Sequence, residues 1–342
     1  SILYSEKYLK TWNTMYDIST YVESGNDLND FEGGFKGKET ATFPYDLKKL
    51  STDNGGYNIL KSTPFGNSIV ADFAIAAIDG EQLGQDNHTD VLAVSFSSTD
   101  YVGHNFGVNS KEVQDTYLRL DKDIERLFNA LDAKVGKGNY TVFLTADHGA
   151  VHVPSYLKSV KIPAGYVSST QARVKFKTFL KEKYNSDDLV ESVSNNQVFL
   201  NREKIKELGL DLHEVQDAIV NEIINYRGID KAYTAYAMTN TAFGSGIEKL
   251  IQNGFNQKRS GDVIYVNDPA TISYSRTGST HGSGLNYDTH VPLLFYGHGI
   301  SKGSTMERTE IVDIAPTISS LVGISRPNGS TEQPIQQVFE DN

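Results

Sequence analysis

The sequence predicts an α/β fold: an α/β/α sandwich with a mostly parallel central sheet and an inserted α+β subdomain. Two short apolar runs, Val91–Phe96 and Tyr140–Thr145, are bounded by turn residues, as expected of buried strands. Between them, apolar residues from Val113 to Leu131 recur on one face of a helix. This order of strand, helix and strand is typical of a βαβ crossover, whose two strands are parallel.

The other core elements follow from similar patterns. Residues 1–60 are polar and rich in turns, and we interpret them as a peripheral connection around the core. A turn at residues 62–68 precedes apolar residues at helical spacing from Ile69 to Ile78. Farther along, Val291–Tyr296 repeats the strand pattern, and Ile311–Leu321 indicates a closing helix.

The pattern changes between residues 155 and 262. This stretch combines charged helices with alternating strands, such as a strand at Gln197–Leu200 and a helix at Leu212–Ile224. We therefore expect an inserted α+β subdomain at 155–262. The core would then consist of residues 1–154 and 263–342.

Composition and charge exclude several classes of protein. The 342 residues include no cysteine, which excludes disulfides, thiolate catalysis and cysteine-bound metals. There are 32 Lys and Arg against 43 Asp and Glu, and the net charge of −11 repels a nucleic-acid backbone. No apolar run approaches the roughly 18 to 20 residues of a transmembrane helix. We expect neither nucleic acid nor a membrane as a partner, and the sequence indicates no oligomeric state.

Three segments next to the predicted strands carry histidine and carboxylate side chains. Asp100 and His104 follow the first strand, and Asp147 and His148 follow the second. His281 stands in a loop of Gly, Ser and Thr residues before the third strand. Because doubly wound sheets bind ligands at the C-terminal ends of their strands, we expect these side chains to face one crevice. Imidazole nitrogen and carboxylate oxygen are ligands that Zn²⁺ accepts.

The five residues supply one complete zinc site and part of a second. Asp100, His104 and His281 provide the three protein ligands of a catalytic zinc, which keeps one position open. Asp147 and His148 begin another site, and two metals about 3.5 to 4 Å apart form the clamp used for displacement at phosphorus. Either the second metal is weakly bound, or one of its ligands lies outside this sequence.

We do not assign the remaining histidines, or Asp288, as metal ligands. Three residues are close to the predicted site in sequence, where hydrogen bonding to a ligand is more common than ligation itself: His152, Asp288 and His290. The others are predicted to lie on the surface or in a turn: His88, His213 and His298.

Several segments carry a resemblance to a known family: Ser98–His104, Tyr117–Asp121, Thr145–Gly149, Thr280–Ser283 and Asp288–Gly297. Together they resemble the alkaline phosphatase superfamily, in its type I phosphodiesterase/nucleotide pyrophosphatase-like branch, and most of all the PafA-type, phosphate-irrepressible alkaline phosphatases. The resemblance implies that Asp100, His104 and His281 bind one zinc and that Asp147 and His148 bind another. It also implies an α/β/α sandwich, hydrolysis of small phosphate esters through a covalent phospho-enzyme, and export to the periplasm or out of the cell.

The sequence departs from that family at its beginning. The family places a metal-binding Asp, the nucleophilic Thr, an Asn and a Lys/Arg pair upstream of the first motif. Residues 1–90 contain no matching motif, and Leu9–Asn13 resembles the segment that follows those elements. We therefore expect this chain to be the C-terminal part of a two-zinc phosphomonoesterase whose threonine nucleophile lies outside it.

Three alternatives remain open from the sequence. A phosphodiesterase or nucleotide pyrophosphatase of the same branch would share the metal site and differ in the groups that contact the phosphate oxygens. A manganese enzyme similar to the cofactor-independent phosphoglycerate mutases is a more distant alternative. If this chain were the whole molecule, it would instead be a non-catalytic binding module with half a metal site.

Overall fold

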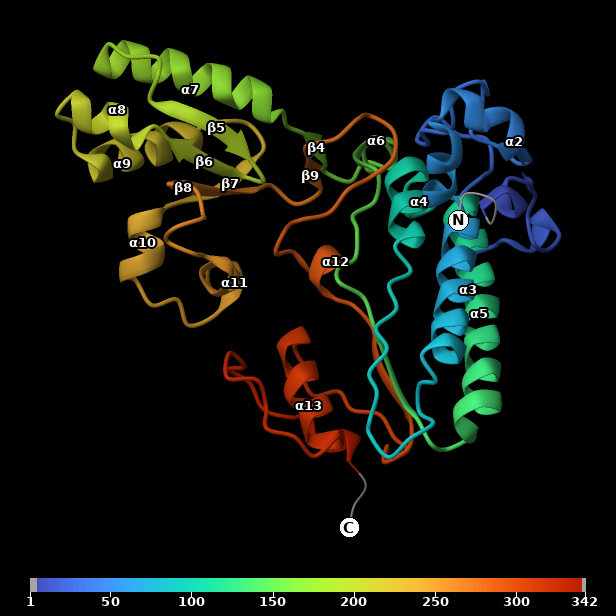
Figure 1. Ribbon diagram of the computed structural model, residues 1–342. Helices are drawn as coiled ribbons and strands as arrows, with labels where there is room; N and C mark the ends of the chain where they lie inside the picture. Colours follow the sequence, from blue (N-terminus) through green and yellow to red (C-terminus); the bar gives the residue numbers. More distant parts are fainter. Residues whose placement is uncertain (1–4, 340–342) are drawn as a thin grey trace.

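The computed structural model describes residues 5–339, in which helices and strands are mixed along the chain (Figure 1). The helices are α2 (Leu47–Leu50), α3 (Pro64–Gly80), α4 (Ser98–Phe106), α5 (Lys111–Leu131), α6 (Pro154–Ser159), α7 (Ser169–Tyr184), α8 (Arg202–Glu207), α9 (Leu212–Ile223), α10 (Ala235–Asn240), α11 (Gly246–Gly254), α12 (Asn286–Thr289) and α13 (Ile314–Leu321). The strands are β1 (Thr11–Trp12), β2 (Tyr45–Asp46), β3 (Thr141–Thr145), β4 (Gly165–Tyr166), β5 (Val190–Ser194), β6 (Gln197–Leu200), β7 (Ile229–Thr234), β8 (Val263–Asn267), β9 (Thr271–Ile272) and β10 (Leu293–Gly297). Within this described part of the chain, no helix is both long enough and apolar enough to span a membrane.

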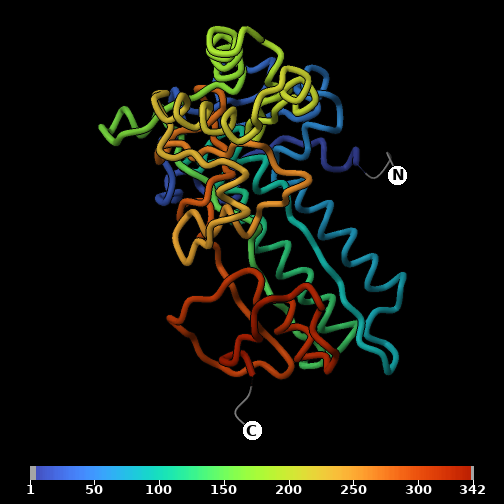
Figure 2. Tube along the Cα trace, turned by 90° about the vertical axis from the view of Figure 1, so that its left-hand side faces the viewer, coloured from blue at the N-terminus to red at the C-terminus, as the bar shows by residue number. Residues whose placement is uncertain are grey.

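The two long helices α3 and α5 lie side by side (Figures 1 and 2). Ile78 of α3 and Leu127 of α5 are buried in one apolar cluster. The Ser110 side chain caps α5 by accepting a hydrogen bond from the Val113 amide at 3.1 Å. Both helices confirm their predictions, and α3 begins earlier than predicted, at Pro64, because the fixed φ of proline suits a first helical turn.

The residues before α3 pack with α4 into a buried core, so the prediction of a peripheral connection is wrong. Trp12, Tyr45 and Phe106 are buried together, with ring centroids 5.3 to 6.0 Å apart. The Trp12 indole also donates a hydrogen bond to the buried Asp115 carboxylate at 2.7 Å. Aromatic rings scattered without periodicity bury a large area once the fold gathers them, which the sequence pattern does not reveal.

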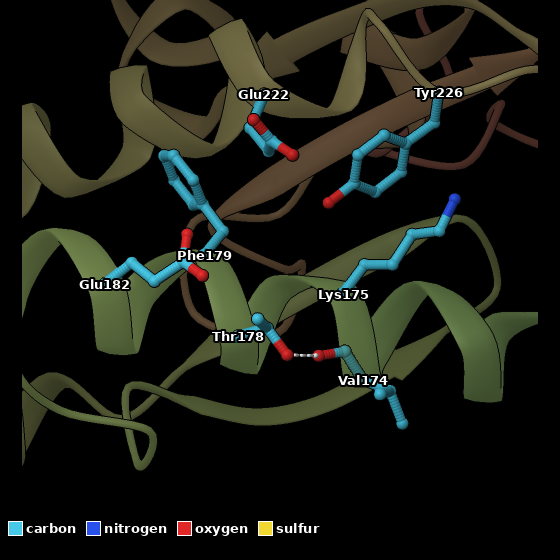
Figure 3. A pocket seen from close by; sticks show the side chains of 7 residues that line it. All are labelled: Val174, Lys175, Thr178, Phe179, Glu182, Glu222 and Tyr226. Carbon is cyan, nitrogen blue, oxygen red and sulfur yellow. Dashed lines mark hydrogen bonds between the residues drawn. The ribbon is translucent and has the colours of Figure 1, made fainter.

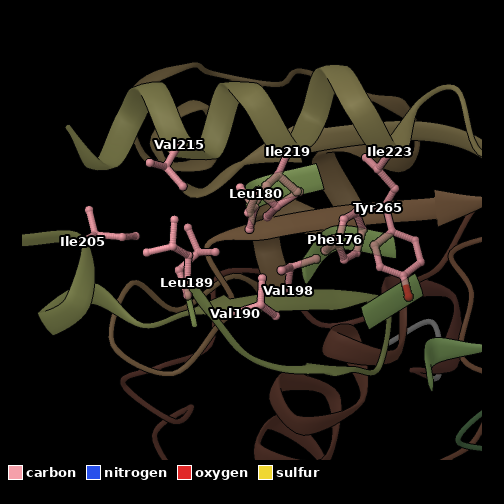
Figure 4. Close-up of a cluster of buried hydrophobic side chains, with 12 residues drawn as sticks. Phe176, Leu180, Leu189, Val190, Val198, Ile205, Val215, Ile219, Ile223 and Tyr265 are labelled. Atoms are coloured by element: carbon pink, nitrogen blue, oxygen red, sulfur yellow. The ribbon is translucent and has the colours of Figure 1, made fainter. Parts of the chain in front are cut away.

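A four-stranded antiparallel sheet of order β5–β6–β8–β7 holds the largest apolar cluster described (Figure 4). The predicted strand at 197–200 and helix at 212–224 are confirmed as β6 and α9. Helices α7 and α9 cover the sheet with buried side chains, among them Phe176, Leu180, Val215, Ile219 and Ile223. The sheet includes β8, which lies just past residue 262, the limit predicted for the inserted subdomain.

The strands β3 and β10 confirm two predicted strands, but they pair antiparallel, with Leu293 opposite Thr145. The predicted strand at Val91–Phe96 is wrong, because this segment is irregular and has no ladder partner among residues 5–339. A strand needs a hydrogen-bonded neighbour, and the described residues place none beside it. The expected βαβ crossover is therefore not formed there, and the parallel pairing in the described part of the chain is that of β4 with β9.

The predicted closing helix forms as α13, which follows a 3₁₀ turn at Ile311–Asp313. It lies near the C-terminal end of the described chain, apart from the four-stranded sheet (Figure 1).

Candidate metal centre

Asp100 and His104 lie on helix α4, which the sequence did not predict. Their spacing of four residues places both side chains on one face of the helix. Val102 and Phe106 are buried and anchor the helix, and Gly107 ends it with a φ of 84°. The helix therefore holds the carboxylate and the imidazole together: Asp100 Oδ2 lies 3.3 Å from His104 Nε2.

Two histidines from distant segments meet Asp100. His281 Nε2 lies 3.5 Å from Asp100 Oδ1. The His148 ring, just after β3, stacks on the His281 ring with centroids 3.3 Å apart. Possible ligand atoms of Asp100, His148 and His281 all lie within 4.8 Å of one another. The structure thus brings together members of both predicted ligand sets.

Asp147 lies at the rim of this cluster. Its side chain is 88% exposed, and its Oδ2 lies 3.5 Å from His148 Nε2. All five predicted ligands are therefore near one another in space, although three segments far apart in the sequence supply them.

Ser279 and Tyr274 fix the orientation of His104, and sequence reasoning did not assign either of them a role. The Ser279 carbonyl oxygen lies 2.8 Å from His104 Nδ1, which is the arrangement that leaves Nε2 free as a ligand atom. The Ser279 hydroxyl in turn donates to the Val151 carbonyl at 2.5 Å. The Tyr274 ring stacks on the His104 ring, with centroids 5.7 Å apart. Ser279 lies within the Gly/Ser/Thr loop noted in the sequence, whereas no sequence pattern marks Tyr274.

Asp288 holds the loop that carries His281. This buried carboxylate accepts hydrogen bonds from the Gly282 amide at 3.0 Å, the Ser283 amide at 2.8 Å and the Ser283 hydroxyl at 2.7 Å. Its backbone carbonyl accepts from the Gly149 amide at 2.7 Å, which links the loop to the segment that follows His148.

The other two residues that were expected to hydrogen-bond to a metal ligand, His152 and His290, lie outside the cluster. His152 is exposed and contacts the Tyr156 ring, with centroids 5.7 Å apart. His290 is exposed at the end of α12.

The electrostatics of the cluster suit a cation. Burial opposes ionisation of Asp100, but the hydrogen bond with His104 and the nearby imidazoles outweigh it and hold the pKa of this carboxyl below its ordinary value. The hydrogen bond with Asp100 raises the pKa of His104. Burial and the neighbouring His148 lower the pKa of His281, which favours the neutral imidazole that binds metal. A carboxylate flanked by imidazoles with free ring nitrogens is a donor set that fits Zn²⁺.

A surface cavity of about 430 Å³ lies elsewhere, between α7 and α9 (Figure 3). Its lining includes Lys175, Phe179, Glu222 and Tyr226, and it shares no residue with the metal-ligand cluster. This cavity is therefore not part of the candidate metal centre.

Comparison with known proteins agrees with this geometry. The profile of the type I phosphodiesterase / nucleotide pyrophosphatase family matches residues 13–291. A Myroides odoratus protein named calcium-transporting ATPase is 43% identical, over 97% of this chain and 61% of its own length. Alkaline phosphatase PafA of Elizabethkingia meningoseptica is 41% identical, over 96% of this chain and 60% of its own length. This chain thus spans about three fifths of the length of these curated relatives.

A solved structure confirms the fold class. The crystal structure of wild type alkaline phosphatase PafA matches with a TM-score of 0.93 and 40% identity, over 98% of this chain and 64% of that one. The α/β class predicted from the sequence is the class of this relative.

Proposed function

We propose that the whole protein is an alkaline phosphatase that hydrolyses small phosphate monoesters. The premise is that this chain belongs to the type I phosphodiesterase / nucleotide pyrophosphatase family. The observation that carries the proposal is the convergence of Asp100, His148 and His281, whose donor atoms lie within 4.8 Å of one another. The name of the relative PafA, an alkaline phosphatase, supports the same activity.

The five ligands divide between two zinc ions. Asp100, His104 and His281 hold one, and Asp147 and His148 contribute to the other. The two oxygens of Asp100 support the first assignment, since Oδ2 faces His104 and Oδ1 faces His281. A zinc pair supplies an activated oxygen nucleophile and offsets the charge of the phosphoryl group.

The second site needs further ligands. The Asp147 carboxylate lies beside His148 and is largely exposed, which suits a site that another segment completes. The remaining ligands and the threonine nucleophile belong to the roughly two fifths of the relatives' length that this chain does not match.

Residues around the ligands orient them for this chemistry. Ser279 keeps His104 in the tautomer that presents Nε2, and Asp288 fixes the loop that presents His281. The rest of this acidic chain repels a phosphate dianion, so the metal centre has to supply the attraction for the substrate. A chain without cysteine suits the periplasm or the cell exterior, where we place the protein.

The decisive experiment compares kcat/KM of the whole protein for an aryl phosphate and for its methyl diester. We expect a clear preference for the monoester, because its extra negative charge gains more from a two-metal centre. Asp100→Ala should lower kcat/KM for the monoester by about three orders of magnitude, while His213→Ala, far from the centre in sequence and structure, should leave it unchanged. A preference for the diester would favour a phosphodiesterase, the activity in the family's name.

A further inference from the structure

Two glutamates, one buried and one half-buried, come together beside the segments that carry the metal ligands. Glu112, in the first turn of α5, is fully buried, and the Glu32 carboxyl lies within hydrogen-bonding reach of it. One oxygen of each is already bonded: Tyr45 donates to Glu112 Oε1 at 2.6 Å, and Asn29 donates to Glu32 Oε1 at 2.6 Å. The second oxygen of each, Oε2, is buried and has no partner among the described residues.

Two ionised carboxylates cannot lie side by side in a buried site without a large cost. A single proton between them would satisfy both of the remaining oxygens, because one carboxyl would donate and the other accept. We propose that Glu32 and Glu112 share one proton between their Oε2 atoms, and that this bond positions the loop at 31–33 against the segments that carry the metal ligands.

The charges around the pair favour retention of the proton. Burial raises the pKa of both carboxyls above the ordinary value of a glutamate. The surrounding charged and titratable groups are Asp27, Lys38, Tyr45, Lys111 and Asp115. Asp27 and Asp115 raise the pKa of Glu112 further, and the two lysines act on Asp27. Asp115 is itself paired with Arg119 at 2.6 Å, and Lys111 donates to the Tyr21 carbonyl at 2.8 Å.

The loop at 31–33 joins both ligand-bearing segments. The Gly33 amide donates to the carbonyl of Asn105, the residue after His104, at 2.8 Å. The Phe31 carbonyl accepts from the Gly278 amide at 2.8 Å, and Gly278 begins the loop that leads to His281. Glu32 lies between these two bonds, so its attachment to Glu112 ties the loop to α5. This inference rests on the proposed metal centre for its function, but the proton itself is testable without any metal.

The proton is tested by the pH dependence of stability. Because burial raises the pKa of the pair above the ordinary glutamate pKa of about 4.5, the folded state holds one more proton than the unfolded state in the pH window between the two values. Stability is therefore greatest at the acid end of this window, falls as the pH rises through it, and levels off above it. Glu32→Gln replaces the shared proton with an amide N–H that donates at every pH and does not titrate.

We expect the unfolding equilibrium constant of the wild-type chain to rise about tenfold more per pH unit than that of Glu32→Gln between pH 5 and 8. Urea unfolding at a series of pH values measures both profiles. The exposed Glu39, replaced by Gln, is the matched control and should keep the wild-type profile. Parallel profiles for the wild type and Glu32→Gln would overturn the shared proton.

The positioning role is tested by zinc affinity, measured by competition with a chelator at pH 7. Glu32→Gln should bind zinc as the wild-type chain does, whereas Glu32→Ala should bind about 10- to 100-fold more weakly. Gly33→Ala provides the same test without removing a carboxyl, because its added Cβ would lie 2.7 Å from the Asn105 carbonyl oxygen and displace the loop.

Wild-type zinc affinity in Gly33→Ala, or in a folded Glu32→Ala, would overturn the positioning role. A wild-type chain that binds no zinc at all would count against the metal centre instead, and the pH profiles would still decide whether the proton is shared.

Discussion

The same tripeptide, Val-Phe-Leu, occupies two strands of this chain with opposite outcomes. In β6 it is residues 198–200, and Val198 and Leu200 are 0% and 3% exposed. In β3 it is residues 142–144, and Phe143 and Leu144 are 41% and 39% exposed. Local sequence therefore makes both segments strands, but it does not decide whether their side chains are buried.

The difference lies in what surrounds each strand. β6 pairs with both β5 and β8, and α7 and α9 pack buried side chains against the sheet. β3 pairs with β10 alone among the described strands, and Leu294 and Tyr296 of β10 are also more than half exposed, at 56% and 53%. The four-stranded sheet thus has the contacts that make a stable core, whereas the β3–β10 ladder contributes apolar surface that residues 5–339 leave uncovered.

The largest effect should come from truncating the leucine that ends the Val-Phe-Leu tripeptide in each of the two strands. Leu200→Ala should lower the free energy of unfolding by about 2 to 5 kcal/mol, because it leaves a cavity in a packed core. Leu144→Ala should lower it by less than about 1 kcal/mol, since the side chain is already partly in water. Urea denaturation of the two variants measures the difference, and equal losses would show that the ladder is packed as tightly as the sheet.

Zinc binding tests whether the region next to the β3–β10 ladder is ordered enough to hold a metal ion. His148 lies three residues past the end of β3, and its ring stacks on the His281 ring. Removing a ligand with His281→Ala should weaken zinc binding by the isolated chain at least about 100-fold. His213, which packs against Tyr236 with ring centroids 4.5 Å apart, lies on the side of the four-stranded sheet, and His213→Ala should leave zinc affinity unchanged. Equal affinities for the two variants would mean that His281 is not a ligand.

Much of this organisation could be predicted from the sequence, for physical reasons. Strong periodicity marks α5, and short apolar runs mark β3, β6 and β10, because these patterns reflect local preferences. The convergence of Asp100, His148 and His281 was also expected, although one strand on which that expectation rested, Val91–Phe96, does not form among the described residues. The prediction of a strand at Val91–Phe96 is wrong, because a strand depends on a neighbour that its own residues do not specify.

Long-range pairings account for the other features that sequence reasoning missed. Helix α4 is anchored by Val102 and Phe106, and the ring partners of Phe106 lie some 60 to 95 residues earlier in the chain, at Tyr45 and Trp12. The Glu32–Glu112 pair joins a loop to a helix across a similar separation. Neither contact leaves a periodic signal, so only the folded structure reveals them.

The smallest effect should come from two matched helix caps, and it tests whether the two regions differ in local structure at all. Ser110 caps α5, which leads to β3, and Ser168 caps α7 on the four-stranded sheet; their side chains accept from the Val113 and Gln171 amides at 3.1 and 3.3 Å. Each Ser→Ala variant should lose about 1 kcal/mol of unfolding free energy, because a cap satisfies a helix end whatever the helix packs against. Thermal or urea unfolding compares the two variants directly.

Similar losses would mean that the regions differ in tertiary cover and not in local helix formation. A loss several times larger for Ser110→Ala would show instead that the first turn of α5, which carries Glu112, controls the stability of its whole region.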